Sequence, residues 1–311
     1  MQDEKNSIDP QKDAFKERLT WKDDMIVKDL VKPITLRRVR LIQIMAFIAA
    51  VAITGVFLWL KYLQPPSGEK LVAEMIQAAG GMDAWKQIHQ GSFLRTHKMY
   101  DEKGNIIKQD DETFYFMNND QGHQLMIKSH SMNGDDVVIG QDANNHYWGS
   151  LNGESGDAHA IAKKMEYMCH DDECVPLCSS EMAFYRFSMP FNLVDPGVIP
   201  KYTGTATLNG KKAMLLDVTF DPKIGKDRWV FYVDPSSKLI RKIEHYSSLE
   251  SNEQPEEIYW SDFKPENNVT IAHSNKYYRS NGRILEEYQI SNVNFNPAFT
   301  NKFFNSPMAS Q

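Results

Sequence analysis

Side chains able to carry out chemistry are present in this 311-residue chain, but they do not gather into a known catalytic pattern. None of the nine histidines belongs to an HExxH or HxH motif, and six stand singly on strand-like segments: His97, His123, His130, His146, His245 and His273. A G-x-S-x-G serine elbow and a glycine-rich phosphate loop after a strand are also missing. We therefore predict a protein that is not an enzyme, with no catalytic residues, no metal site and no cofactor.

The three cysteines lie close together, in the segment Cys169-HDDE-Cys174-VPL-Cys178. The acidic residues and His170 between them suggest a metal site, but the segment has no CxxC pair and its carboxylates are consecutive. In an oxidising compartment one disulfide within this set, with the third thiol left over, fits the pattern better. The sequence does not decide which two cysteines pair.

One segment of the chain is apolar enough to cross a membrane. From Leu41 to Leu60 no residue carries a formal charge, and a helix of this length matches the ~30 Å hydrocarbon core of a bilayer. Trp59, Lys61 and Tyr62 stand at its end, where such side chains prefer to lie. A core helix is rarely apolar all round over this length, and no cleavage site follows. We predict an uncleaved transmembrane signal anchor over residues 41–62.

Basic residues flank this segment unequally. Only Lys61 and Lys70 follow it closely, whereas six basic residues precede it: Lys22, Lys28, Lys32, Arg37, Arg38 and Arg40. By the positive-inside rule, residues 1–40 lie in the cytoplasm and residues 67–311 are exported. In a bacterium with two membranes this predicts a single-pass inner-membrane protein with a periplasmic domain. In a eukaryote the domain would be lumenal or extracellular.

Charge and size bound the remaining possibilities. The formal net charge is −6 and no basic stripe alternates with aromatic residues, so nucleic acid is not an expected partner. The exported part, about 245 residues, has the size of one β-rich domain. Residues 13–31 form an amphipathic run, interpreted either as a surface-lying helix or as a docking segment for a cytoplasmic or membrane partner.

The pattern of the exported part predicts a series of strands with two helical interruptions. A helix over 71–81 is predicted, with Ser67 as its cap and Gly80 and Gly81 at its end, and a short helical segment follows at 82–88. From Gln90 onward alternating segments are separated by turn signals such as Asn209-Gly210. Two helices, AHAIAKKMEYM and SSEMAFYRFSM, interrupt the strands between Asp157 and Val194. We expect about eleven antiparallel strands and no parallel crossovers.

The order of these parts resembles the Lol-carrier-like (LolA/LolB-like) half-barrels of the outer-membrane lipoprotein-sorting superfamily. The resemblance covers roughly residues 71–295 and is carried by GQDANNHYW, RWVFYVDPSSKLIRKIEHY and YWSDFKPENNVTIAHSNKYY. Its best segment is 229–246, and Asp142 and Trp148 match the family's "Asp-Gly, then Trp" strand. The resemblance implies a mainly β fold with helices (α+β), an incompletely closed antiparallel β-barrel with a helical lid, here preceded by one transmembrane helix.

In that family the half-barrel holds an acyl chain in an apolar concavity, which implies a cavity here as well. Alternating apolar residues on strands and a helix rich in methionine and aromatic residues are suited to line it. The candidate cavity residues are Phe114, Phe116, Leu125, Ile127, Trp148, Met182, Phe184, Phe187, Met189, Met214, Leu216, Val218, Phe220, Trp229 and Phe231. The alternative is that these side chains fill a collapsed core, as in any half-buried sheet.

Together these observations predict an inner-membrane protein whose periplasmic domain binds a lipid or a lipoprotein acyl chain in envelope lipid or lipoprotein handling. The alternative is a sensor or assembly subunit that uses the half-barrel to grip an envelope protein. Residues 13–31 and the acidic loop 170–173 would then be contact surfaces. The expected partners are thus a lipid or acylated protein, the inner membrane and, in the alternative, another envelope protein.

Overall fold

The computed structural model describes residues 36–58, 65–120, 122–144, 146–164, 178–248, 254–279 and 281–305. The chain divides into two compact units, residues 1–64 and residues 65–311, which are described separately below. The predicted cytoplasmic run 13–31 and the aromatic and basic residues 59–62 lie outside the described residues.

The first unit contains a single described helix, α2 (Leu36–Leu58), which corresponds to the predicted anchor. Its large apolar side chains face solvent, and Phe47 for example is 69% exposed. Within the described residues, only the part Val39–Leu58 of this helix is long and apolar enough to cross a membrane. Among the described residues these side chains are not buried, and the length and composition of the helix are those of a membrane span.

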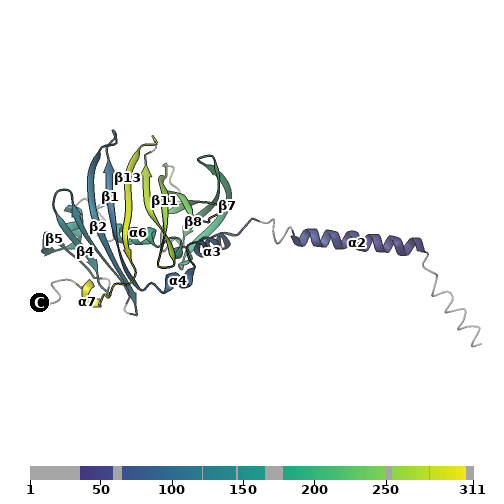
Figure 1. The fold of residues 1–311 in the computed structure, drawn as a ribbon, viewed down its shortest axis with the longest axis horizontal. Helices are drawn as coiled ribbons and strands as arrows, with labels where there is room; N and C mark the ends of the chain where they lie inside the picture. Colours follow the sequence, from purple (N-terminus) through teal and green to yellow (C-terminus); the bar gives the residue numbers. More distant parts are fainter. Residues whose placement is uncertain are drawn as a thin grey trace, which may run out of the picture. The chain divides into compact units, whose positions relative to one another are not determined.

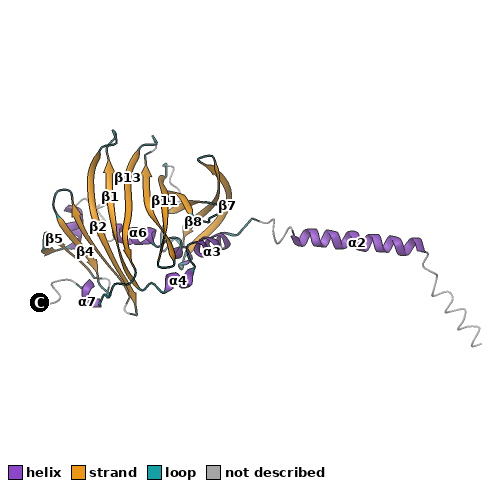
Figure 2. Ribbon diagram, in the orientation of Figure 1, coloured by secondary structure: helices purple, strands orange, loops and turns teal. Residues whose placement is uncertain are grey.

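The second unit is built on one thirteen-stranded antiparallel sheet (Figures 1 and 2). Its first half comprises β1 (Gln90–Tyr100), β2 (Ile106–Asn119), β3 (Gly122–Ser131), β4 (Asp136–Gln141), β5 (Tyr147–Leu151) and β6 (Glu154–Gly156). Its second half comprises β7 (Val198–Leu208), β8 (Lys211–Phe220), β9 (Arg228–Val233), β10 (Ile240–Tyr246), β11 (Glu256–Glu266), β12 (Val269–Tyr278) and β13 (Ile284–Asn294).

The two halves are consecutive meanders that join where β1 pairs with β13. The strand order runs from β6 at one edge to β7 at the other, so the sheet remains open. The predicted fold class, a mainly β protein with an incompletely closed antiparallel sheet, is confirmed. The strand count exceeds the expected eleven or so, and β6, only three residues long, carries no alternation that would reveal it.

Register explains how alternating sequences build one apolar face. Phe114 lies opposite Ile127, and Leu216 lies opposite Phe231. Directly opposite residues point to the same side of the sheet, and so does every second residue along each strand. These residues belong to the main core cluster, which extends over both meanders. We call this side of the sheet the concave face.

Helix α3 (Gly68–Ala78) covers part of the concave face, and α4 (Met82–Lys86) follows it. The Ser67 side chain accepts a hydrogen bond of 3.2 Å from the backbone N–H of Lys70, as the capping prediction requires. Gly80 and Gly81 have φ of 113° and 91°, and a Cβ at Gly80 would lie 2.1 Å from the Asn268 carbonyl oxygen. Glycine is needed here both for the backbone conformation and for the close approach to the sheet.

The connection between β6 and β7 contains α5 (Ala158–Lys164), α6 (Cys178–Phe187) and the 3-10 helix η2 (Phe191–Val194). Because β6 and β7 are the two edge strands, this connection runs from one edge of the sheet to the other. Figure 2 shows α6 on the same side of the sheet as α3. Cys169 and Cys174 lie outside the described residues, as do the side-chain contacts of Cys178, so the disulfide remains a prediction.

The C-terminal segment packs on the opposite face of the sheet. Phe304 of α7 (Asn301–Phe304) is fully buried in a second cluster with Met117, Met126 and Trp148. The Trp148 Nε1–H donates a hydrogen bond of 2.8 Å to the Phe304 carbonyl oxygen. This segment therefore covers the outer face of the first meander.

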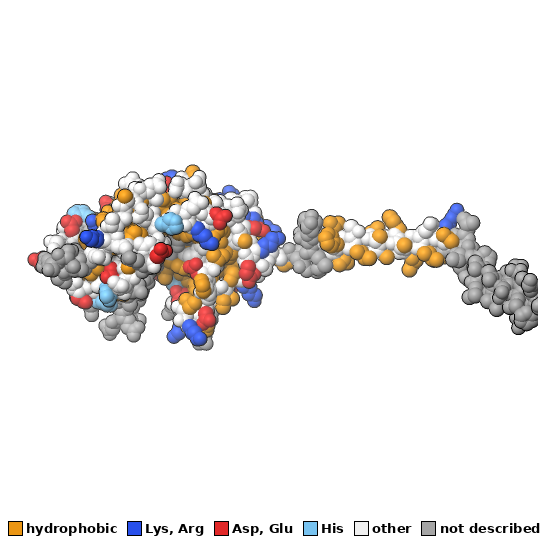
Figure 3. Space-filling model, turned by 90° about the horizontal axis from the view of Figure 1, so that it is seen from below, with side chains coloured by type: hydrophobic (Ala, Val, Ile, Leu, Met, Phe, Trp, Pro, Cys, Tyr) orange, Lys and Arg blue, Asp and Glu red, His pale blue; other side chains and the backbone are white. Residues whose placement is uncertain are grey.

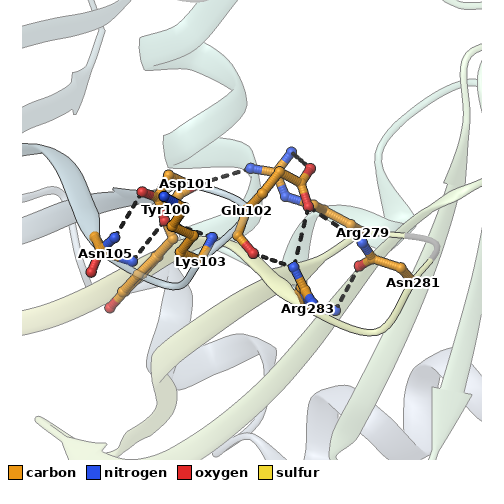
Figure 4. Close-up of polar contacts among 8 residues, drawn as sticks. All are labelled: Tyr100, Asp101, Glu102, Lys103, Asn105, Arg279, Asn281 and Arg283. Carbon is orange, nitrogen blue, oxygen red and sulfur yellow. Dashed lines mark hydrogen bonds and ion pairs between the residues drawn. The ribbon is translucent and has the colours of Figure 1, made fainter.

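Two hairpin loops are tied together where the meanders meet (Figure 4). The Glu102 carboxylate, in the loop between β1 and β2, lies 3.2 Å from Arg279 and 3.8 Å from Arg283, which flank the loop between β12 and β13. Arg279 Nη2 also donates a hydrogen bond of 2.7 Å to the Tyr100 carbonyl oxygen. These contacts reinforce the β1–β13 junction at one end of the sheet.

Candidate binding site on the concave face

The floor of the candidate site is formed by side chains from adjacent strands. Opposite pairs of Met214 with Val233, Leu216 with Phe231 and Val218 with Trp229 place the predicted apolar residues of β8 and β9 side by side. Of the predicted set, the main cluster buries Phe114, Phe116, Leu125, Ile127, Met214, Leu216, Val218, Trp229 and Phe231, with Phe220 packed against it. The sequence-predicted strand residues thus form one apolar surface.

The short helix α6 covers this floor. Phe187 stacks on Phe93 of β1 with ring centroids 4.0 Å apart, and Phe184 lies 4.8 Å from Phe116. Phe187 and the following Met189 are buried in the cluster, whereas Met182 and Phe184 are only partly buried. Helix α6 therefore covers the part of the floor around Phe93 and Phe116.

Trp148 does not belong with the other candidate residues. It lies on β5 in the outer cluster, and a Cβ at Gly140 would come within 2.4 Å of its ring. The sequence pattern could not place Trp148 correctly. Alternation divides the residues of a strand between two faces but does not indicate which face is the concave one.

The domain is hollowed on one side. In the view from below, hydrophobic side chains gather along the wall of this hollow (Figure 3). Such a combination of concave shape and apolar lining is typical of sites that bind apolar ligands.

A belt of polar side chains continues the concave face beyond the apolar floor. Arg95 Nε donates a hydrogen bond of 2.6 Å to Glu112 Oε2, and the two side chains are only 14% and 2% exposed. Two residues further along β1, His97 Nε2 lies 3.3 Å from Glu286 Oε2 of the neighbouring strand β13. The Tyr288 hydroxyl donates to Glu286 at 2.7 Å. Side chains of this kind are rarely buried unless they are paired, as they are here.

The belt extends to β10 and β11. His245 lies 2.9 Å from Asp227 and 3.3 Å from Glu256, and its ring is 4.8 Å from that of Trp229. Burial alone would lower the pKa of His245, but the two carboxylates outweigh it and raise the pKa above the ordinary value. The hydrogen bond from His245 lowers the pKa of Glu256.

Arg186 of α6 reaches into this belt from the helix that covers the floor. Its Nη1 donates a hydrogen bond to the Tyr277 hydroxyl. The guanidinium carbon lies 5.4 Å from the centre of the Tyr277 ring and 5.7 Å from that of Trp229. These distances are within the range of cation–π attraction.

Several site residues escaped sequence reasoning. Phe93, Ile243, Ile258 and Ile290 join the same cluster from strands on both sides of the β1–β13 junction. Their strands alternate recognisably, but only the pairing of the first strand with the last brings these faces together. The polar belt was missed because isolated charged residues on alternating strands usually face solvent.

Comparisons with solved structures define the class of fold. A DUF1329 family protein from Desulfovibrio piger ATCC 29098 superposes with a TM-score of 0.52 at 13% identity, covering 78% of this chain and 99% of that chain. A LolA superfamily protein from Nitrosomonas europaea superposes with a TM-score of 0.51 at 8% identity, covering 78% of this chain and 100% of that chain. The domain therefore has a LolA/LolB-like fold, as its sequence resemblance implied.

Sequence comparison adds a narrower match. Residues 162–288 match the model of a family of unknown function, DUF6503. No curated protein matches the sequence.

Proposed function

We propose that this chain is a non-enzymatic binding protein of the cell envelope, anchored in the inner membrane by α2, whose half-barrel holds the acyl chain of a lipid or lipoprotein. The observation that carries the proposal is the apolar floor on the concave face, part of which is covered by the short helix α6. The LolA/LolB-like fold and the apolar helix Val39–Leu58 support it.

The energetics of the floor favour an acyl ligand. Burying apolar groups stabilises by ~0.8 kcal/mol for each methylene, so a long chain replacing the phenylalanines of α6 binds without any polar contact. Exchange is feasible because the ligand buries the same floor that α6 buries in its absence. In this proposal α6 is a lid over the acyl chain. The proposal also places residues 1–40 in the cytoplasm and the half-barrel on the other side of the membrane.

Extraction of the purified domain tests the proposal. Residues 65–311 form a compact unit with its own core and can be prepared without α2. Organic extraction followed by mass spectrometry is expected to recover a stoichiometric acylated compound. A lipid-free domain that instead retains one envelope protein in equimolar amount would support the alternative function of a protein-interaction module.

A further inference from the structure

The lid helix α6 presents two kinds of side chain to the concave face. Phe184 and Phe187 lie on the apolar floor, and Arg186 between them reaches the polar belt. A helical segment with this arrangement has the chemistry of an amphiphile, with an apolar part and a cationic group. The surroundings of Arg186 therefore indicate which head group the site accepts once the lid moves.

The surroundings of the Arg186 guanidinium form a cage suited to a cation. The rings of Tyr277 and Trp229 lie 5.4 and 5.7 Å from it. Aromatic rings at this distance, partly withdrawn from water, attract cations and are used to bind ammonium groups.

Carboxylates complete the cage. Glu256 pairs with His245, and Glu286 pairs with His97. Burial alone would raise the pKa of Glu286, but the hydrogen bonds with His97 and Tyr288 and the charge of Arg186 outweigh burial, and the pKa is lowered. The Arg186 charge also contributes to the lowered pKa of Glu256, after the His245 hydrogen bond. Both carboxylates are thus held in the anionic form within electrostatic reach of the guanidinium, and Glu286 lies opposite Tyr277 in the pairing of β12 with β13.

Arg186 occupies this cage incompletely. Its Nε is buried and has no hydrogen-bond partner among the residues that the structure describes, although the guanidinium group carries five donors. A buried donor left without a partner costs free energy, which favours replacing Arg186 by a group that fits the cage better.

We propose that the cage of Trp229, Tyr277, Glu256 and Glu286 binds the ammonium head group of an amphiphile whose tail lies on the apolar floor, and that Arg186 occupies this position while the lid is closed. This inference rests on the proposed function, because the lid must open for either part of the ligand to bind. It narrows the ligand to cationic or zwitterionic amphiphiles that carry an ammonium group.

Binding of matched dodecyl probes to the domain 65–311 tests the inference. Dodecyltrimethylammonium, dodecyl maltoside and dodecylphosphocholine share one tail and differ in the head, and each is titrated calorimetrically below the concentration at which it forms micelles. The ammonium probe is expected to bind about tenfold more tightly than the maltoside, the effect of one or two cation–π contacts. If dodecylphosphocholine binds as tightly as the ammonium probe, the natural head group is zwitterionic. If it binds only as tightly as the maltoside, the natural head group is a simple amine.

Variants separate the cage from general attraction to an acidic protein. Glu286→Gln and Tyr277→Leu should each reduce the preference for the ammonium probe severalfold without changing maltoside affinity. Glu287→Gln is the control, since it removes the same charge from the adjacent residue, which pairs instead with Lys276. Arg186→Gln should increase the affinity for the ammonium probe more than for the maltoside. If Arg186 only held the lid closed, the substitution would change both affinities equally.

Two results would overturn the inference. Equal affinities of the three probes, unchanged by Glu286→Gln, would exclude the cage while leaving the acyl site intact. Failure of all three probes to bind would exclude the acyl site, and the cage with it.

Discussion

At the scale of single residues, Arg95 shows how a charged side chain is accommodated inside the half-barrel. Its guanidinium carbon lies between the rings of Phe114 and Tyr288, at 4.6 and 4.7 Å from their centres, while its Nε bonds to Glu112. Burial would lower the pKa of Arg95, but the charge and hydrogen bond of Glu112 outweigh it, and the pKa is raised. The buried pair is tolerated because each charge is matched by the other. Loss of one partner leaves the other charge buried and unpaired, which destabilises the folded domain.

Replacing Arg95 with methionine is therefore expected to cost about 3 kcal/mol or more of unfolding free energy, since Glu112 is left buried without its counter-charge. Urea denaturation of the domain measures this. The double variant Arg95→Met, Glu112→Leu should recover most of the loss. A single variant as stable as the wild type would show that water reaches Glu112 freely.

His123 gives the domain a defined sensitivity to acid. Its ring packs 5.1 Å from Phe184 of the lid, and its Nδ1 is hydrogen-bonded with the Asn118 side chain. Burial lowers the pKa of His123 to about 4. The unfolded chain takes up this proton near pH 6.5 and the folded chain only near pH 4, so stability falls as the pH falls between these values.

The size of this loss is on the order of 3 kcal/mol. Thermal unfolding of the wild type and of His123→Gln between pH 7 and pH 4 checks it, because the variant should lose less stability over this range. His130→Gln, on the exposed part of the same strand, is the control. Parallel pH profiles for the wild type and His123→Gln would contradict the prediction.

The apolar alternation in the sequence correctly predicted which residues of β2, β3, β8 and β9 share a face, because period two is a local property of a strand. It misplaced Trp148, since alternation cannot distinguish the concave face from the outer face. Nor could it predict that Arg95 meets Glu112, because that contact depends on the register between strands.

At the scale of elements, the connection from β6 to β7 contains the helix proposed as the lid, α6. Turn signals and helical periodicity predicted two helices here, and α5 and α6 are both found. Their role as a crossing between the two sheet edges could not be predicted, since it follows from the pairing of β1 with β13. The lid is thus a consequence of topology and not of its own sequence alone.

Phe187→Glu is expected to abolish binding of a fluorescent fatty-acyl probe, because α6 must also cover the bound chain, and a carboxylate at the position that now packs on Phe93 cannot be buried against an alkyl chain without a partner. Phe303→Glu, which alters an aromatic residue on the outer face, should leave binding unchanged. If Phe187→Glu does not fold, Phe184→Glu serves, since Phe184 is only partly buried. Full affinity in the folded lid variants would show that α6 does not cover the acyl site.

At the scale of the whole molecule, the apolar helix and the half-barrel belong to separate compact units. The apolar helix was predictable because length and hydropathy are properties of the sequence alone. Its orientation is a proposal that depends on the basic residues before it.

A reporter enzyme active only outside the cytoplasm, fused after Gln311, is expected to be active in the wild type. Replacing Arg37, Arg38 and Arg40 with glutamine should lower its activity, because these residues hold their end of the helix in the cytoplasm. The same replacement at Lys201, Lys211 and Lys212, far from the helix in sequence, is the control. An inactive wild-type fusion in a stable protein would reverse the proposed orientation.

Because the sheet does not close, the strand β7 keeps one side of its backbone unpaired within the described residues. Eleven residues of free strand would invite stacking of one molecule on the next into aggregates. Pro200 has no N–H to offer, the register shifts between Tyr202 and Gly204, and Lys201 adds an exposed charge. These three interruptions hinder pairing of the free β7 edge with a second molecule. The sheet can therefore stay open without aggregation at high local concentration.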